Sequence, residues 1–236
     1  MMVTILHEGA HASTAFMLGV PSTLFNYSVD HHLTQAQLAT WRPAIIAVAG
    51  PTFCLVLGVL ACFAYKRARG SRAELPLLYF SALGVGTFFG NLVSISVVGD
   101  FSQAAARLGL PMTLRYVGSA LGALGTAGVQ LWLGRELIGF VPEKVSRAGR
   151  ALGVIVGPVV VATFIVILVN QPMREGFASA RLGEAAFSLF AIVAAWVAGN
   201  QSDRPGPLKV QWVDAVAMIV AVTIVRVATR GIDFIP

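Results

Sequence analysis

Long apolar runs recur along the chain, and they limit the folds that are open to it. A helix needs about 20 mostly apolar residues to cross the hydrocarbon core of a bilayer. The 236 residues are 56% hydrophobic and only 12% charged. Runs of suitable length cover residues 3–20, 43–65, 76–98, 113–133, 151–170, 184–200 and 212–229. The sequence therefore predicts an all-α polytopic membrane protein with six or seven transmembrane helices.

The charged residues fit the same class of protein. The net charge is +6, and the basic residues gather between apolar runs, as in "YKRARGSRAE" and "VPEKVSRAGR". Basic loops of this kind orient membrane proteins, and no basic stretch is interleaved with the aromatic residues of a nucleic-acid platform. We expect a multi-pass protein of the cell membrane whose partners include the lipid bilayer and no nucleic acid. Its oligomeric state is left open.

The first apolar run contains the motif "HEGAH". On a helix, His7 and His11 lie one turn apart on one face and can present nitrogen atoms to a common point. Glu8 lies beside them, which completes the H-E-x-x-H pattern of two zinc ligands and a general base. The alternative is a set of packed polar side chains. Ionisable groups at membrane depth are costly and usually functional, which favours the metal.

Two histidines do not complete a catalytic zinc site, which normally has three protein ligands and one open position. Thr14 and Met17 occupy the positions at which metzincins carry a glycine and a third histidine, so that class is excluded. Asp100 is the strongest candidate for the third ligand, because it follows a long apolar run without a basic partner nearby. It is also a candidate helix N-cap. The rival ligands are His31 and His32 in "VDHHLTQ".

Three motifs, taken in order, resemble the site-2 protease family of intramembrane zinc metalloproteases. They are "HEGAH", "AGP" at residues 49–51, and "GNLVSISVVGD" at residues 90–100. The resemblance covers residues 1–110 and implies a zinc metalloprotease core of three spans there. Residues 111–236 are then additional transmembrane helices of the same membrane domain. Cys54 stands where the family has an asparagine soon after "AGP".

The resemblance also implies roles for individual residues. One zinc ion would be held by His7, His11 and Asp100, with Glu8 as the catalytic base and Asn91 beside the substrate backbone. The enzyme would be a zinc metalloendopeptidase that cleaves peptide bonds in or near the transmembrane helices of membrane proteins. A short, partly extended, membrane-associated segment at about residues 20–38 would guide the substrate.

One departure of the third motif from the family leads to a structural prediction. The spacing from Asn91 to Asp100 is one residue longer than in the family, and one residue rotates a helical side chain by about 100°. The family geometry therefore requires the helix to unwind before Asp100. Gly99 and the nearby serines favour such a break.

Other interpretations of the sequence remain. A metal-binding membrane transporter or a catalytically silent protease relative would also carry histidine and aspartate in a membrane. The orientation is open, because the loop charge favours a cytoplasmic location for the side opposite the zinc motif, whereas the resemblance implies a site that opens toward the cytosol. Cys54 and Cys62 fall in one apolar run and are expected to be packed thiols rather than a disulfide.

Overall fold

The computed structural model describes residues 2–140, 219–220, 223–224 and 227–236. Over these residues the chain is mostly helical and contains one small sheet. The spans expected at 151–170 and 184–200, and most of the one at 212–229, lie outside the described residues. The predicted unit of further helices at 111–236 is therefore described only in part.

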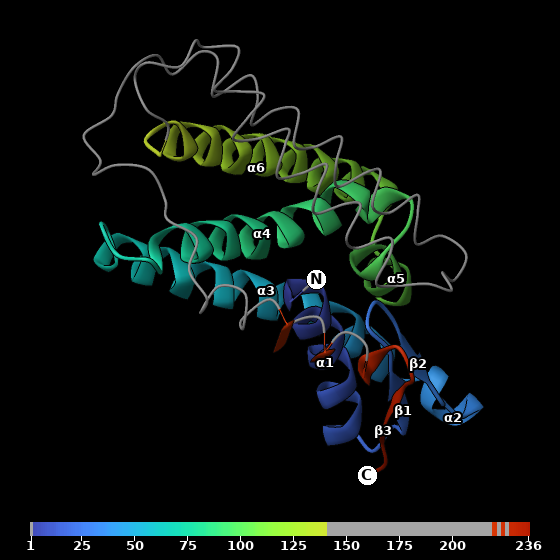
Figure 1. Ribbon diagram of the computed structural model, residues 1–236. Coiled ribbons are helices and arrows are strands. Elements are labelled where there is room, and N and C mark those ends of the chain that lie inside the picture. The colour runs from blue at the N-terminus through green and yellow to red at the C-terminus, as the bar shows by residue number, and fades with distance from the viewer. Residues whose placement is uncertain (1, 141–218, 221–222, 225–226) are drawn as a thin grey trace.

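The elements are six helices, one short 3-10 helix and three short strands within the described residues. In chain order they are α1 (Met2–Met17), β1 (Ser22–Leu24), β2 (Val29–His31), α2 (Gln35–Leu38), α3 (Arg42–Arg67), α4 (Glu74–Val93), η1 (Ser94–Ser96), α5 (Asp100–Arg107), α6 (Met112–Ile138) and β3 (Ile232–Phe234). Figure 1 shows α3, α4 and α6 side by side, with α1, α5 and the sheet gathered near the start of α3.

Two of the described helical segments are long and apolar enough to cross a membrane. They are Arg42–Arg67, which is α3, and Glu74–Ser96, which is α4 with η1. These segments match the apolar runs at 43–65 and 76–98 and confirm them as long helices. The runs expected at 3–20 and 113–133 are also helices, α1 and α6, but neither is among the segments long and apolar enough to span a membrane, so six or seven spans are not shown.

Small residues allow the long helices to approach closely. A Cβ atom added to Gly122 of α6 would lie 2.4 Å from the backbone nitrogen of Val93 at the end of α4. At the far end of α4 and α6, Leu78 and Leu133 are buried in one apolar cluster with Tyr65 of α3. The glycine-rich stretch "GSALGALGTAG" at residues 118–128 therefore contains the glycines, Gly122 and Gly125, at which α6 lies close against α4.

The segment after α1 is partly extended, as expected for residues 20–38: it forms the hairpin of β1 and β2 and ends in the short helix α2. The strands pair in antiparallel register, with Ser22 opposite His31 and Leu24 opposite Val29. The C-terminal strand β3 pairs antiparallel with the other edge of β1, which gives the order β2-β1-β3. This sheet brings the C-terminal strand beside the hairpin that follows α1 (Figure 1), and β3 is the one strand of it that the prediction of helices with a short extended segment did not include.

The chain leaves the helical conformation before Asp100. Helix α4 ends at Val93, η1 follows, and Gly99 has a φ of 98° directly before α5 begins. The third apolar run is thus helical only to Ser96 and not to residue 98 as expected. The predicted break is present, and it allows Asp100 to leave the axis of α4.

Candidate metal centre

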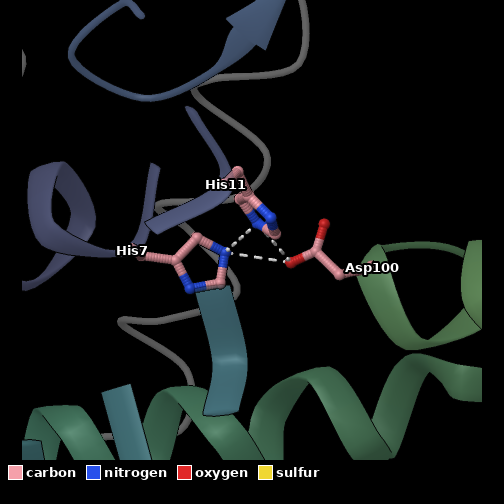
Figure 2. Close-up of side chains that lie close together, drawn as sticks. All are labelled: His7, His11 and Asp100. Carbon is pink, nitrogen blue, oxygen red and sulfur yellow. Dashed lines mark hydrogen bonds and ion pairs between the residues drawn. The ribbon is translucent and has the colours of Figure 1, made fainter. Parts of the chain in front are cut away.

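Three side chains from two helices converge at the end of the molecule where α1, α3 and α5 meet (Figure 2). His7 and His11 are buried on one face of α1, and Asp100 is the first residue of α5. The His7 Nε2 atom lies 2.9 Å from Asp100 Oδ2 and 3.1 Å from His11 Nε2. The remaining side of the triangle, from His11 Nε2 to Asp100 Oδ2, is 3.4 Å.

Close packing of α5 against α3 positions Asp100. Ala104 of α5 is buried against Ala44 and Ala47 of α3, and these small side chains allow the two helices to approach. The N-cap of α5 is Gly99, and no side-chain cap bond is formed there. The interpretation of Asp100 as an N-cap is therefore wrong. Its carboxylate points toward the two histidines (Figure 2).

The first turns of α3 fix the imidazole of His11. Its Nδ1–H group donates a hydrogen bond of 2.6 Å to the backbone oxygen of Ile46. In the neutral ring this leaves Nε2 with its lone pair directed at the cluster. Gly50 makes room for the ring, because a Cβ atom there would lie 2.4 Å from His11 Nε2.

Cys54 lies beside His7 Nδ1, as the Ile46 backbone oxygen lies beside His11 Nδ1. Its Sγ atom lies 3.6 Å from His7 Nδ1 and 3.9 Å from the backbone oxygen of Val3. Both Cys54 and Cys62 are free thiols, as predicted. The sequence did not predict the contact with His7, although the position of Cys54 after "AGP" was a usable signal.

Asp100 is an ionised acceptor in this arrangement. Burial raises the pKa of its carboxyl group, but hydrogen bonds and positive charge from His11 and His7 outweigh burial and hold that pKa below its ordinary value. A carboxylate that stays charged is the form that binds a cation.

A cavity of about 310 Å³ adjoins the cluster. Glu8 lines it together with His11 and Asp100. The remaining wall comes from the hairpin region, α3 and α5, and consists of Tyr27, Ser28, Val29, His31, Leu33, Pro43, Ile46, Ala47 and Gln103. The structure thus brings the expected base and two of the expected ligands to one cavity.

The other candidates are not members of the three-residue cluster. Asn91 does not line this cavity, and its Nδ2 group donates to the backbone oxygen of Thr87, one turn earlier in α4. His32 is exposed, with its Nε2 atom 3.4 Å from Thr23 Oγ1. His31 lines the cavity but is not a member of the three-residue cluster.

No family model, curated protein or solved structure matches the chain. What the site can do therefore follows from its own residues. Among the described residues, one group of three or more histidine, cysteine, aspartate or glutamate side chains lies close enough together to hold a metal ion. It consists of His7, His11 and Asp100. Two imidazoles and a carboxylate suit a divalent transition metal.

Proposed function

We propose that the chain is an intramembrane zinc metalloprotease that resembles the site-2 protease family. It hydrolyses peptide bonds in or near the transmembrane segments of membrane-protein substrates. The observation that carries this proposal is the placement of Glu8 on the cavity that adjoins the cluster of His7, His11 and Asp100. A general base beside a ligand set is the arrangement that metal-assisted hydrolysis requires.

The size and chemistry of the ligand triangle support zinc. Its sides of 2.9, 3.1 and 3.4 Å are close to the separation of about 3.3 Å between ligand atoms that lie 2.0–2.1 Å from a tetrahedral zinc ion. The three protein ligands leave one of four positions open, as in catalytic zinc sites. Zinc bound there would acidify a water molecule and polarise the scissile carbonyl group.

The residues of the chain supply the remaining steps. The Glu8 carboxylate takes a proton from the attacking water and then delivers it to the leaving amine. Asp100 stays ionised, and His11 keeps its orientation through its bond to Ile46. The extended hairpin forms part of the cavity wall, and the cavity offers room for an unwound peptide segment.

The membrane setting is part of the proposal. The segments 42–67 and 74–96 are long and apolar enough to span a bilayer, and further apolar runs in the sequence support six or seven spans. A substrate helix has its peptide groups hydrogen-bonded internally. We therefore expect cleavage where a substrate helix unwinds easily, at glycine, proline or polar residues.

The test compares wild type with Glu8→Gln, purified in detergent. Both are assayed for zinc content and for cleavage of apolar peptides that carry a central Gly-Pro step, with the products identified by mass. Glu8→Gln should keep its zinc and lose about 10²- to 10⁴-fold in rate, the usual contribution of a general base. Asp30→Asn, an exposed carboxylate on β2, is the control and should cleave normally. Equal cleavage by wild type and Glu8→Gln at equal zinc content would contradict the proposal.

A further inference from the structure

Two polar atoms are left without partners on one face of the hairpin. Ser22 and His31 lie directly opposite each other in the antiparallel pair, so their side chains share a face. Within the described part of the chain, Ser22 Oγ and His31 Nδ1 are both buried and lack a hydrogen-bond partner. Buried polar atoms in folded proteins nearly always have a partner, and because these two share one face the Ser22 hydroxyl is the natural donor to His31 Nδ1, which leaves the N–H group of the ring at Nε2.

The face that carries His31 is also a wall of the cavity beside the metal cluster. Val29 and His31, two residues apart on β2, both line that cavity. Glu8, His11 and Asp100 line it as well. A molecule that reaches the cluster therefore passes within reach of the His31 ring.

The surroundings of His31 keep its imidazole neutral. Burial is the largest cause, and with the positive charge of His11 it lowers the pKa of His31 to about 4, although Asp30 and Asp100 oppose the shift. At neutral pH the ring therefore has one N–H donor and one acceptor nitrogen, and no charge.

We propose that His31 is a substrate-binding residue whose Nε2–H group, at the ring nitrogen that is not buried, donates a hydrogen bond to the oxygen of the scissile carbonyl. This inference rests on the proposed protease function. As the carbonyl carbon becomes tetrahedral, its oxygen gains negative charge, and the hydrogen bond strengthens. The imidazole keeps its proton throughout, because Glu8 alone carries the proton from water to the leaving amine.

The other groups on the cavity favour this role for His31. Glu8 and Asp100 are carboxylates, which accept hydrogen bonds from the substrate but do not donate them when ionised. Tyr27 and Ser28 line the cavity but already interact with other groups. Gln103 of α5 also lines the cavity with an amide donor, whereas His31 lies on the hairpin, and its unburied ring nitrogen forms no hydrogen bond with the described residues, so donation to the substrate breaks no existing bond.

The experiment compares His31→Ala, His31→Gln and His32→Ala in the full-length chain. His32 is the matched control, because it is the next residue and is exposed. Zinc content, kcat and KM are measured on the same Gly-Pro peptides. His31→Ala should keep its zinc and lose about 10²-fold in kcat with little change in KM, as expected for a donor that acts in the transition state. His31→Gln retains an N–H donor and should recover part of the loss, while His32→Ala should match wild type.

The outcomes separate the inference from the function on which it rests. If wild type cleaves and His31→Ala keeps a kcat within about twofold of it, the inference is wrong and the protease proposal stands. If His31→Ala and His31→Gln lose zinc as well as activity, His31 has a structural role and the inference is again wrong. If wild type cleaves none of the peptides while its zinc is bound, the protease proposal and the inference fall together.

Discussion

Each histidine of the cluster is oriented by a contact at its second ring nitrogen. His11 Nδ1 donates to the backbone oxygen of Ile46, and His7 Nδ1 lies beside Cys54 Sγ. Both contacts come from α3, and both leave Nε2 facing Asp100. Partners of this kind fix the tautomer and the rotamer of a metal ligand before the metal arrives.

Replacement of Cys54 tests the contact with His7. Cys54→Ala removes the sulfur 3.6 Å from His7 Nδ1 and should weaken zinc binding about 10-fold, the lower end of the usual effect of such partners. The measurement is the zinc Kd by competition with a chelator. Cys62→Ala, two turns along the same helix, is the control and should keep the wild-type Kd. Equal affinities for the two variants would show that Cys54 does not support the ligand.

Replacement of Gly50 tests the space around His11. In Gly50→Ala the new Cβ would lie 2.4 Å from His11 Nε2, so the ring must move away from the cluster. The purified variant should contain well under one zinc per chain by elemental analysis. Gly9→Ala is the control, because a Cβ at that position meets no described atom within 4 Å. Full zinc occupancy in Gly50→Ala would contradict this account of how "AGP" shapes the site.

At the scale of the elements, the break between α4 and α5 places Asp100, the proposed third ligand. Gly99 has φ 98° and ψ −174°, a conformation that only glycine adopts at low cost. A Cβ there would also lie 3.2 Å from Ser94 Oγ. The backbone before Asp100 therefore depends on glycine both for its dihedral angles and for its space.

Gly99→Ala should disturb the metal site and not only the stability of the chain. The strain of about 1–3 kcal/mol at such a residue is relieved by movement of the adjacent Asp100, so zinc affinity should fall together with the melting temperature. Gly109→Ala is the control, because Gly109 also has a positive φ (65°) but meets no described atom and is remote from the ligands. It should lower the melting temperature alone. A Gly99→Ala protein with wild-type zinc affinity would show that the break does not set the position of Asp100.

The C-terminal strand should stabilise the hairpin that walls the cavity. An isolated two-stranded hairpin is marginally stable, and β3 adds a third strand, with Thr23 Oγ1 donating to Asp233 Oδ1 at 2.7 Å. Truncation after Gly231 should therefore speed deuterium exchange at the backbone amides of residues 22–31. Thr23→Val removes only the exposed hydrogen bonds of one side chain, to Asp233 and His32, and should have a much smaller effect. Unchanged exchange in the truncated chain would mean that β3 does not support the hairpin.

At the scale of the whole molecule, periodic and local signals in the sequence predicted the main elements. The apolar runs at 43–65 and 76–98 are the long helices α3 and α4, and the extended segment after α1 contains the hairpin. The i, i+4 spacing in "HEGAH" places His7 and His11 on one face, as observed. These features depend on residues that are close together in the chain, which is why they can be predicted from a single sequence.

Several features that depend on the approach of distant segments were not predicted, although the meeting of Asp100 with the two histidines was expected from the resemblance. Strand β3 has only three residues and no pattern of its own, and it forms because β1 offers a free edge far away in the sequence. The contacts of Ile46, Gly50 and Cys54 with the histidines depend on how closely α3 packs against α1. The side-chain amide of Asn91 forms a hydrogen bond within its own helix. Its role beside a substrate stays a prediction.

The central claim is that residues from α1 and α5 jointly hold one zinc ion. The most direct measurement is the zinc content of purified wild type, His11→Ala and Asp100→Ala, with Asp30→Ala as the control for loss of an acidic side chain. We predict one zinc per chain in wild type and Asp30→Ala, and well under one in the other two. Full zinc occupancy in Asp100→Ala would contradict the account, because the third ligand would then have to come from a different residue.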